Sequence, residues 1–327
     1  MGGRGSRTVP ALLLATVLLA ALAGFIAISA AHQVRARAPQ DPDATYITGC
    51  VNITSPGYYV ISANITGVQG TGYCIGIFAS GVVLDGGGHV LAGPGNGRGV
   101  GIYVAPGSSN VTIEDVAVGR YSTGIYVNSS GVRITDSFVG GNTYGVNVTG
   151  SYDSIIGSNV TYNLRVGVYV NGSHDSVVDS AVGGGSWYSI YVAGNNDSII
   201  GSAVGGSWYG VNVTGSYDSV VDSTVGSNVL VGVSIAGSHD SILNSTVSNN
   251  GRVGVYVAGD NDSIVSSTVG GNVFGVEVAG SYNSIANSTV SHNRWFGVSI
   301  TGYGDSVIGS TVSHDGHGIY INGSYDS

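Results

Sequence analysis

The sequence contains no lysine, so its 10 basic residues are all arginine, and they are set against 19 acidic residues. The net charge of −9 leaves no basic stripe that could follow a phosphate backbone. This charge balance argues against a nucleic-acid partner.

Residues that usually fill helical cores are also scarce. The 327 residues include one Met, five Phe and only 9% charged residues, against 56 Gly and abundant Ser, Thr, Asn and Val. This composition argues against long helices and favours many short strands joined by tight turns.

Long hydrophobic runs are limited to one, near the N-terminus. Two arginines precede an almost unbroken apolar stretch at residues 9–31, which is typical of an export signal or a membrane anchor. Its length favours an anchor, whereas residues 29–31 and 36–38 offer small-residue cleavage sites. We therefore expect an exported protein, extracellular or at the cell surface, in which residues 1–38 form a signal peptide or a membrane anchor with a short linker.

Cysteine is limited to Cys50 and Cys74. In an exported chain an isolated pair is most simply a disulfide, and two buried thiols are the alternative. Their separation along the chain is close to the repeat length described next, which predicts that the two residues lie on neighbouring layers.

An internal repeat, which starts near residue 76, is the strongest signal in the chain. A Gly-Val-x-Val-type tetrad recurs with a period of roughly 22 residues, and an Asp-Ser marker and a Ser-Thr-Val-type segment keep step with it. The tetrads begin at Gly101, Gly124, Gly145, Gly167, Ser189, Gly210, Gly232, Gly254, Gly275, Gly297 and Gly318, so that after the first interval their positions differ by 21 or 22. Three short strands per unit predict one coil of an all-β parallel β-helix.

The alternation of side chains within a strand predicts how the coils stack, because both aliphatic residues of each tetrad point inward. The stacks expected for one pair of coils are Val146 on Val168, Val148 on Val170, Ile155 on Val177 and Val160 on Val182. Left-handed β-helices are built from hexapeptides, and 21–22 is not a multiple of six, so a right-handed helix is expected.

With the opening segments at residues 55–60, 74–77 and 82–86, the pattern resembles the right-handed parallel β-helix proteins of the NosD type and the wider pectate-lyase-like superfamily. The resemblance covers roughly residues 44–327. It implies the fold but no single function, because the fold hosts lyases, hydrolases, epimerases, adhesins and proteins without known activity.

This organisation predicts an N-terminal cap and first strands at residues 39–80 and β-helix coils at residues 81–327. The last coil stops in mid-unit after Asp326, which predicts either a fragment or self-association through an uncapped coil. A longer period that spans three coils is also present, since residues 144–154 recur letter for letter as residues 209–219. Such duplication favours a repeated surface over an active site, which needs unlike residues at one place.

An Asp column accompanies the repeat. Its members precede the second strand of each coil and are Asp153, Asp175, Asp197, Asp218, Asp240, Asp262, Asn283, Asp305 and Asp326. Coils lie about 4.8 Å apart, so these carboxylates repel one another unless they are hydrogen-bonded or share a cation. We interpret each Asp as a cap for turn amides, with calcium as the alternative, best placed where Asp179 supplements Asp175 or Asp222 supplements Asp218.

Histidine is clustered near the end of the chain. His292 and His314 are separated by one repeat length and should stack on adjacent coils, with Asp315 and His317 beside them. Such a set is a candidate zinc or copper site, and the NosD resemblance implies a copper association. The chain has no Met-rich or Cys-rich tract to support it.

The segment at residues 316–319 resembles the Gly-His-Gly element of polygalacturonases, but the aspartates with which those enzymes hydrolyse pectin are missing. A lyase needs a cationic base near calcium carboxylates, and Arg165, Arg252 and Arg294 lie several coils apart on one turn. A polysaccharide lyase or glycoside hydrolase is therefore the alternative to a non-catalytic protein.

Aromatic residues give the preferred functional interpretation. Six aromatic residues are expected on one exposed edge. Trp187, Tyr188, Trp208 and Tyr209 lie in the same turn of successive coils, and Tyr169 and Tyr191 take the outward position of the strand that follows. Pyranose rings stack on such platforms, and the alternative is a self-stacking ladder that stiffens the turns. The sequence thus predicts an exported scaffold that binds a polysaccharide or cell-surface glycan, with a NosD-like copper-site maturation factor as a second alternative. Thirteen Asn-x-Ser/Thr sequons add an expectation of glycosylation.

Overall fold

The computed structural model describes residues 43–68, 72–95 and 97–327, and in these residues the chain forms strands and turns without a helix. Among them no helix is long and apolar enough to cross a membrane. The expected signal peptide or anchor at residues 1–38 lies outside the described residues.

The strands form three parallel sheets, here called sheets A, B and C. Sheet A contains β1 (Ala44–Ile47), β3 (Gly57–Ile61), β6 (Val82–Asp85), β9 (Val111–Glu114), β12 (Val132–Thr135), β15 (Ser154–Ile156), β18 (Ser176–Val178), β21 (Ser198–Ile200), β24 (Ser219–Val221), β27 (Ser241–Leu243), β30 (Ser263–Val265), β33 (Ser284–Ala286) and β36 (Ser306–Ile308). Sheet B contains β2 (Val51–Ile53), β5 (Tyr73–Ile77), β8 (Val100–Val104), β11 (Thr123–Val127), β14 (Tyr144–Val148), β17 (Val166–Val170), β20 (Tyr188–Val192), β23 (Tyr209–Val213), β26 (Val231–Ile235), β29 (Val253–Val257), β32 (Phe274–Val278), β35 (Phe296–Ile300) and β38 (His317–Ile321). Sheet C contains β4 (Ile65–Thr66), β7 (Val90–Ala92), β10 (Ala117–Gly119), β13 (Phe138–Gly140), β16 (Asn159–Thr161), β19 (Ala181–Gly183), β22 (Ala203–Gly205), β25 (Thr224–Gly226), β28 (Thr246–Ser248), β31 (Thr268–Gly270), β34 (Thr289–Ser291) and β37 (Thr311–Ser313).

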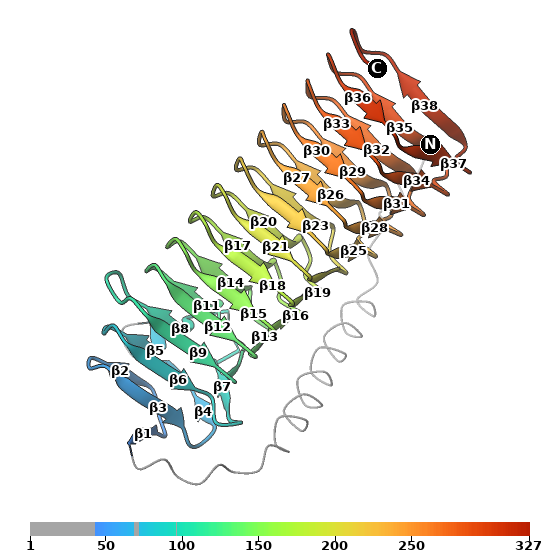
Figure 1. The fold of residues 1–327 in the computed structure, drawn as a ribbon. Coiled ribbons are helices and arrows are strands. Elements are labelled where there is room, and N and C mark those ends of the chain that lie inside the picture. The colour runs from blue at the N-terminus through green and yellow to red at the C-terminus, as the bar shows by residue number, and fades with distance from the viewer. Residues whose placement is uncertain (1–42, 69–71, 96) are drawn as a thin grey trace, which may run out of the picture.

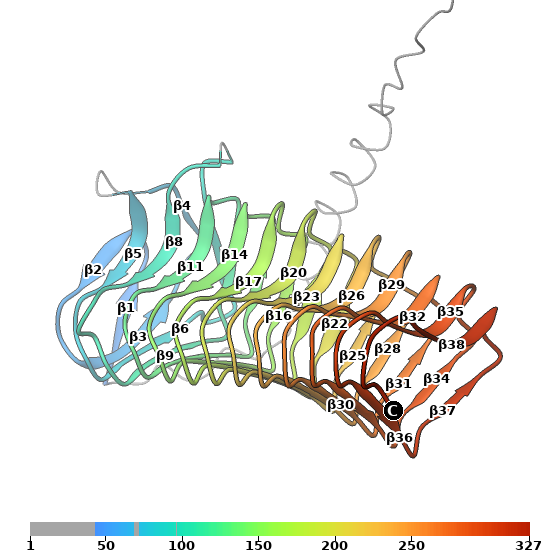
Figure 2. The same ribbon diagram turned by 90° about the horizontal axis from the view of Figure 1, so that it is seen from above.

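From β5 onward the chain visits sheets B, A and C in turn and then returns to sheet B one layer further along. The coils follow one another along a single axis, with the blue first strands and the red last strands at opposite ends (Figures 1 and 2). In a typical coil the B-to-A corner is residues 149–153, the A-to-C corner is residues 157–158 and the C-to-B corner is residues 162–165. The predicted β-helix, with three short strands per coil, is confirmed.

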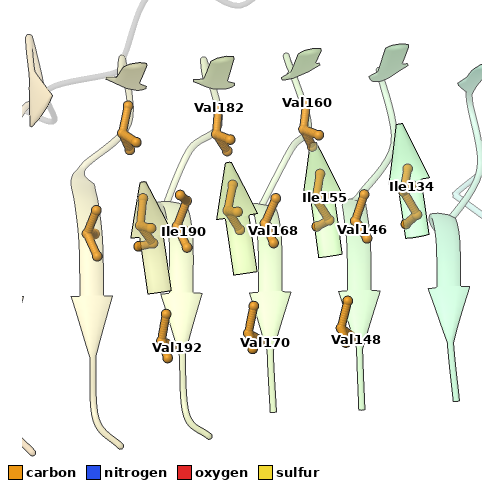
Figure 3. Packing of buried hydrophobic residues seen from close by; sticks show 14 of the residues in the cluster. Ile134, Val146, Val148, Ile155, Val160, Val168, Val170, Val182, Ile190 and Val192 are labelled. Carbon is orange, nitrogen blue, oxygen red and sulfur yellow. The ribbon is translucent and has the colours of Figure 1, made fainter. Parts of the chain in front are cut away.

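Aliphatic side chains from all three sheets fill the interior as columns of like residues (Figure 3). The register pairs Val146 with Val168 and Val148 with Val170. It also pairs Ile155 with Val177 and Val160 with Val182, so the predicted stacks are confirmed. Burying each such side chain contributes about 1.5–3 kcal/mol, so these columns supply most of the stabilisation. In β38, which only one coil contacts, the inward residues Ile319 and Ile321 are 48% and 49% exposed.

Polar side chains close the corners with hydrogen bonds between coils. At the A-to-C corner, the backbone N–H of Ser158 donates to Ser180 Oγ, and that of Ser180 donates to Ser202 Oγ. At the C-to-B corner, the N–H of Asn250 donates to Asn272 Oδ1 at 2.8 Å. These columns satisfy amides that the short strands leave unpaired.

The disulfide between Cys50 and Cys74 is formed, with Cα atoms 4.5 Å apart. The next residue of each, Val51 and Ile75, pair across β2 and β5. The two cysteines therefore lie on neighbouring coils, as predicted.

Candidate functional site

The two tryptophans of the predicted platform are the last residues of consecutive C-to-B corners. Trp187 directly precedes β20 and Trp208 directly precedes β23. They are 55% and 52% exposed, so each ring presents much of its surface to solvent. The guanidinium of Arg165, at the same place one coil earlier, lies 5.8 Å from the ring centroid of Trp187 and holds that ring from one side.

The four tyrosines of the platform lie on the outer face of sheet B and contact one another. The Tyr169 and Tyr191 rings stack with centroids 5.3 Å apart, and Tyr188 meets both Tyr191, at 5.2 Å, and Tyr209, at 5.3 Å. Burial, reinforced by the neighbouring tyrosines, raises the pKa of Tyr169 and Tyr188. The row is thus a self-stacked ladder of phenol rings, and only its edges and hydroxyl groups are available to a ligand.

An open groove of about 390 Å³ lies on the neighbouring face, over sheet C. Its lining residues are Thr161, Tyr162, Ala181, Val182, Gly183, Gly184, Ala203, Val204, Gly205, Thr224, Gly226, Ser227, Ser248 and Asn249. The outward residues of β19 and β22 are Ala and Gly, whereas those of β16 and β28 are Asn, Thr and Ser. The groove is therefore formed because the outward side chains of these two strands are small or absent. None of its lining residues is charged.

The same coils depart from the repeat at their C-to-B corner, where Gly185 and Ser207 replace the Asn of other coils. Ser189 replaces the tetrad Gly in this region, and its hydroxyl donates to Ser207 Oγ at 2.9 Å. In an ordinary coil a Cβ on the tetrad glycine Gly210 would come within 2.6 Å of both Asn228 Nδ2 and the carbonyl oxygen of Gly232. Asn at the facing position therefore adds to the crowding that a Ser would meet there, whereas Ser207 accepts a hydrogen bond from Ser189, so the two departures are physically coupled.

Trp295 lies at the same corner several coils further along, and it was not predicted from the sequence as part of the platform. It precedes Phe296 and Gly297 just as Trp208 precedes Tyr209 and Gly210, and it is 56% exposed. Its ring packs edge-on against Phe274, with centroids 5.6 Å apart. The shared Trp-aromatic-Gly pattern was the signal that could have identified it.

The Asp column lies inside the coil at the B-to-A corner. Oδ1 of each Asp accepts the backbone N–H of its equivalent one coil earlier, as between Asp153 N and Asp175 Oδ1 at 2.7 Å. The same bond joins Asp175 to Asp197 and Asp197 to Asp218. The capping interpretation therefore describes the contact, but the capped amide belongs to the preceding coil.

Burial raises the pKa of Asp175, Asp197 and Asp218 from 3.8 to about 7. The hydrogen bond that each carboxyl accepts lowers the pKa, and the charge of the neighbouring Asp raises it further. Strongly shifted carboxyls often mark active sites. These side chains are 3–4% exposed and face the interior, away from any bound polymer.

The calcium pairs proposed from the sequence do not come together. The three residues of β18 separate Asp175 from Asp179, and β24 separates Asp218 from Asp222 in the same way. Each pair thus spans opposite ends of a strand, about 13 Å apart at the rise of an extended chain. Asp222 Oδ1 accepts a hydrogen bond from Asn244 Nδ2 at 2.5 Å instead.

The histidines of the predicted metal set are only partly brought together. The His292 and His314 rings stack with centroids 5.0 Å apart, as expected for adjacent coils. Asp315 Oδ1 accepts hydrogen bonds from the backbone and side chain of Asn293, and His317 lies against Phe296. In the part of the chain that the structure describes, no three His, Cys, Asp or Glu side chains are grouped so as to hold a metal.

Two family models match the chain. The model described as "Periplasmic copper-binding protein (NosD)" matches residues 80–240, and the model described as "Right handed beta helix region" matches residues 231–327. The chain is a right-handed parallel β-helix protein. The handedness expected from the coil length is thereby confirmed, and the histidine set at residues 292–317 lies outside the NosD match.

Solved structures with this fold include several that act on polysaccharides. The mannuronan C-5 epimerase AlgE4 A-module of Azotobacter vinelandii is 16% identical to this β-helix protein, with a TM-score of 0.63 over 87% of this chain and 91% of that one. The periplasmic alginate epimerase AlgG is 12% identical, with a TM-score of 0.54 over 88% and 79%. A GH87 α-1,3-glucanase catalytic domain in complex with tetrasaccharides is 11% identical, with a TM-score of 0.53 over 87% and 65%. These likenesses establish the fold, and no curated protein matches the chain in sequence.

Proposed function

We propose that this β-helix protein is an extracytoplasmic scaffold that binds a polysaccharide along its C-to-B corner without chemically changing it. The observation that carries the proposal is that Trp187 and Trp208 are exposed on consecutive coils. Both lie in the corners that follow β19 and β22, the sheet C strands that line the uncharged groove. Exposed indole faces spaced one coil apart suit successive sugar rings, and the small groove residues let a chain lie close to the backbone.

The extracytoplasmic part of the proposal is supported by the Cys50–Cys74 disulfide, because such bonds persist in oxidising compartments. The apolar run at residues 9–31 suits export. The NosD model and the structural neighbour AlgG are both described as periplasmic.

The enzymatic alternative needs residues that converge on one sugar. Asp175 lies inside the B-to-A corner, Asp179 is at the A-to-C corner and Arg165 is at the C-to-B corner, while His317 lies on sheet B several coils away. Residues at three different corners cannot contact one glycosidic bond, so the geometry favours binding over a reaction carried out by this set.

The test is affinity electrophoresis of the full chain in gels that contain mannuronan or α-1,3-glucan, the polymers suggested by the structural neighbours. Replacing Trp187 or Trp208 by Ala should weaken binding of the recognised polymer about tenfold for each ring, because stacking contributes up to about 1.5 kcal/mol. Trp295→Ala is the matched control, since it removes the same side chain from the same corner away from the groove.

Retention by both polymers that is unchanged in the Trp187→Ala/Trp208→Ala variant contradicts the proposed surface. New reducing ends or unsaturated products after incubation with either polymer contradict the non-catalytic role and favour the lyase or hydrolase alternative.

A further inference from the structure

The second oxygen of each column Asp has no partner. Oδ2 is buried and without a hydrogen bond in Asp153, Asp175, Asp197, Asp218, Asp240, Asp262, Asp305 and Asp326. An unpaired buried carboxylate oxygen is costly, and a column of them would add mutual repulsion between coils. The geometry therefore requires a positive partner for each Oδ2 or a neutral form of the side chain.

Asn283 identifies what this oxygen faces. It occupies the column position of one coil, and its Oδ1 accepts the N–H of Asp262 as an Asp does. Its Nδ2 donates to the carbonyl oxygen of Gly259, at 3.1 Å. The group that occupies the Oδ2 position thus acts as a donor to the glycine carbonyl of the preceding coil.

The aspartates stand in the same relation to the equivalent glycines. A Cβ placed on Gly172 would overlap the carbonyl oxygen of Gly150 and lie within 2.5 Å of Asp175 Oδ2, so those two oxygens are close neighbours. If both oxygens could only accept hydrogen bonds, the Asp175 Oδ2 and the Gly150 carbonyl oxygen would repel each other. A proton on Oδ2 turns the contact into a hydrogen bond of the kind that Asn283 makes.

Around Asp175, Asp197 and Asp218 the interior offers no other compensation for the unpaired oxygens. Beside Asp175, Asp197 and Asp218 the interior leaves about 10 Å³, at the lower limit for one water molecule. The walls of that space are the aliphatic side chains of Val170, Val177, Val192, Ile199 and Val213, with Ser176, Ser198 and Ser219. The charged neighbours of these carboxyls are the column members above and below.

Further along the column, other ionisable groups contribute. Asp260 raises and His239 lowers the pKa of Asp262, which burial has already raised to about 6. Burial also raises the pKa of Asp305, to which Asp326 and Asp260 add. The members from Asp153 to Asp240, in which burial raises the pKa to about 7, thus form the most protonated part of the column.

We propose that the Asp column is a proton-binding site, in which neutral aspartic acids donate from Oδ2 to the glycine carbonyls of the preceding coil and hold the coils together. This role of the column does not depend on glycan binding. It makes this β-helix protein an acid-favoured fold that loosens as the protons leave.

The sign of the pH dependence follows from the folded-state pKa of about 7 for Asp153, Asp175, Asp197, Asp218 and Asp240. A pKa raised above that of the unfolded chain gives stability that is complete below about pH 4 and is lost as the pH rises through about 7. We expect the Tm of the full chain to fall by roughly 10 °C or more between pH 5 and pH 8.

Isosteric variants assign this effect to the column. Asp197→Asn carries a permanent donor, so its Tm should match the parent at pH 4 and exceed it at pH 8. Asn283→Asp is the matched reverse change and should lower the Tm at pH 8 while leaving it nearly unchanged at pH 4. Unfolding at pH 6 should release protons, and infrared spectra of the folded chain at that pH should contain the carbonyl band of neutral carboxylic acids.

Three results would overturn the proposal. One is a Tm that rises from pH 5 to pH 8 in the parent. Another is a lower Tm for Asp197→Asn than for the parent at pH 8. The third is stabilisation by CaCl₂ at pH 8 that Asp197→Asn removes, which would mean that the column holds metal cations and not protons.

Discussion

The B-to-A and C-to-B corners of this β-helix are built in the same way, by a polar side chain that accepts an amide of the preceding coil, yet they are kept to different degrees. At the B-to-A corner, eight of the nine positions from 153 to 326 are Asp and one is Asn. At the C-to-B corner the Asn column is interrupted by Gly185 and Ser207, and Trp187 and Trp208 stand there.

The difference shows that packing restricts the residues of the B-to-A corner, whereas the residues of the C-to-B corner can vary. In the coils from Asp153 onward, the B-to-A corner combines a buried polar side chain with a glycine that has no room for a Cβ, so packing restricts both positions. At the C-to-B corner, Ser189 and Ser207 restore the lost contact between coils, and the turn residues then change without unfolding the coil. Uniform corners hold the fold, and the interrupted corner is where a surface can be modified.

The largest effect is expected from Gly172→Ala at the B-to-A corner. The added methyl group would overlap the carbonyl oxygen of Gly150 and press on Asp175 Oδ2, which should destabilise the domain by about 3 kcal/mol. Gly318→Ala is the control, because a Cβ there meets no atom within 4 Å. Thermal unfolding followed by circular dichroism measures both, and equal Tm values would show that this corner is not constrained.

An intermediate effect is expected from Gly210→Ser at the C-to-B corner. The new Cβ would approach Asn228 Nδ2 and the carbonyl oxygen of Gly232 within 2.6 Å, at a cost of about 2 kcal/mol. Adding Asn228→Ser recreates the natural combination of Ser189 and Ser207 and should recover the part of the loss that Asn228 causes, while the contact with the Gly232 carbonyl oxygen stays. A double-mutant cycle measures the coupling, and purely additive losses would contradict the link between the two positions.

The smallest effect on stability is expected from the exposed rings of the interrupted corner. Trp187→Ala and Trp208→Ala should each change the free energy of unfolding by no more than about 0.5 kcal/mol, since both side chains are more than half exposed. A loss several times larger in denaturant unfolding would make the tryptophans structural and would remove the contrast between the corners.

The fold could be predicted from the sequence because period and alternation fix it. Inward positions such as Val146 and Val168 recur at the coil length, and a parallel stack is the arrangement that buries them all. The corners could not be predicted in this way. Tyr152 and His174 have φ values of 62°, and this left-handed backbone turns the following Asp inward, which a two-residue alternation does not reveal.

The candidate site was predicted in part. Trp187 and Trp208 are exposed as expected, whereas the rings of the tyrosines beside them pack against one another. The groove on sheet C was missed because it consists of absent side chains, Ala and Gly on β19 and β22, and such positions give no chemical signal in a sequence. The partition of aspartates between interior and surface also depends on corner geometry.

The disulfide and the layer-by-layer bonding together determine how the molecule responds to a pulling force. Each strand is hydrogen-bonded only to the equivalent strands of the coils before and after it, so tension on the ends peels coils away one at a time. Each freed coil of about 22 residues lengthens the chain by roughly 70 Å. At the N-terminal end the Cys50–Cys74 bond closes its 24-residue loop covalently, so that loop yields no length. A tether attached there transmits force into the rod instead of unwinding its first coil.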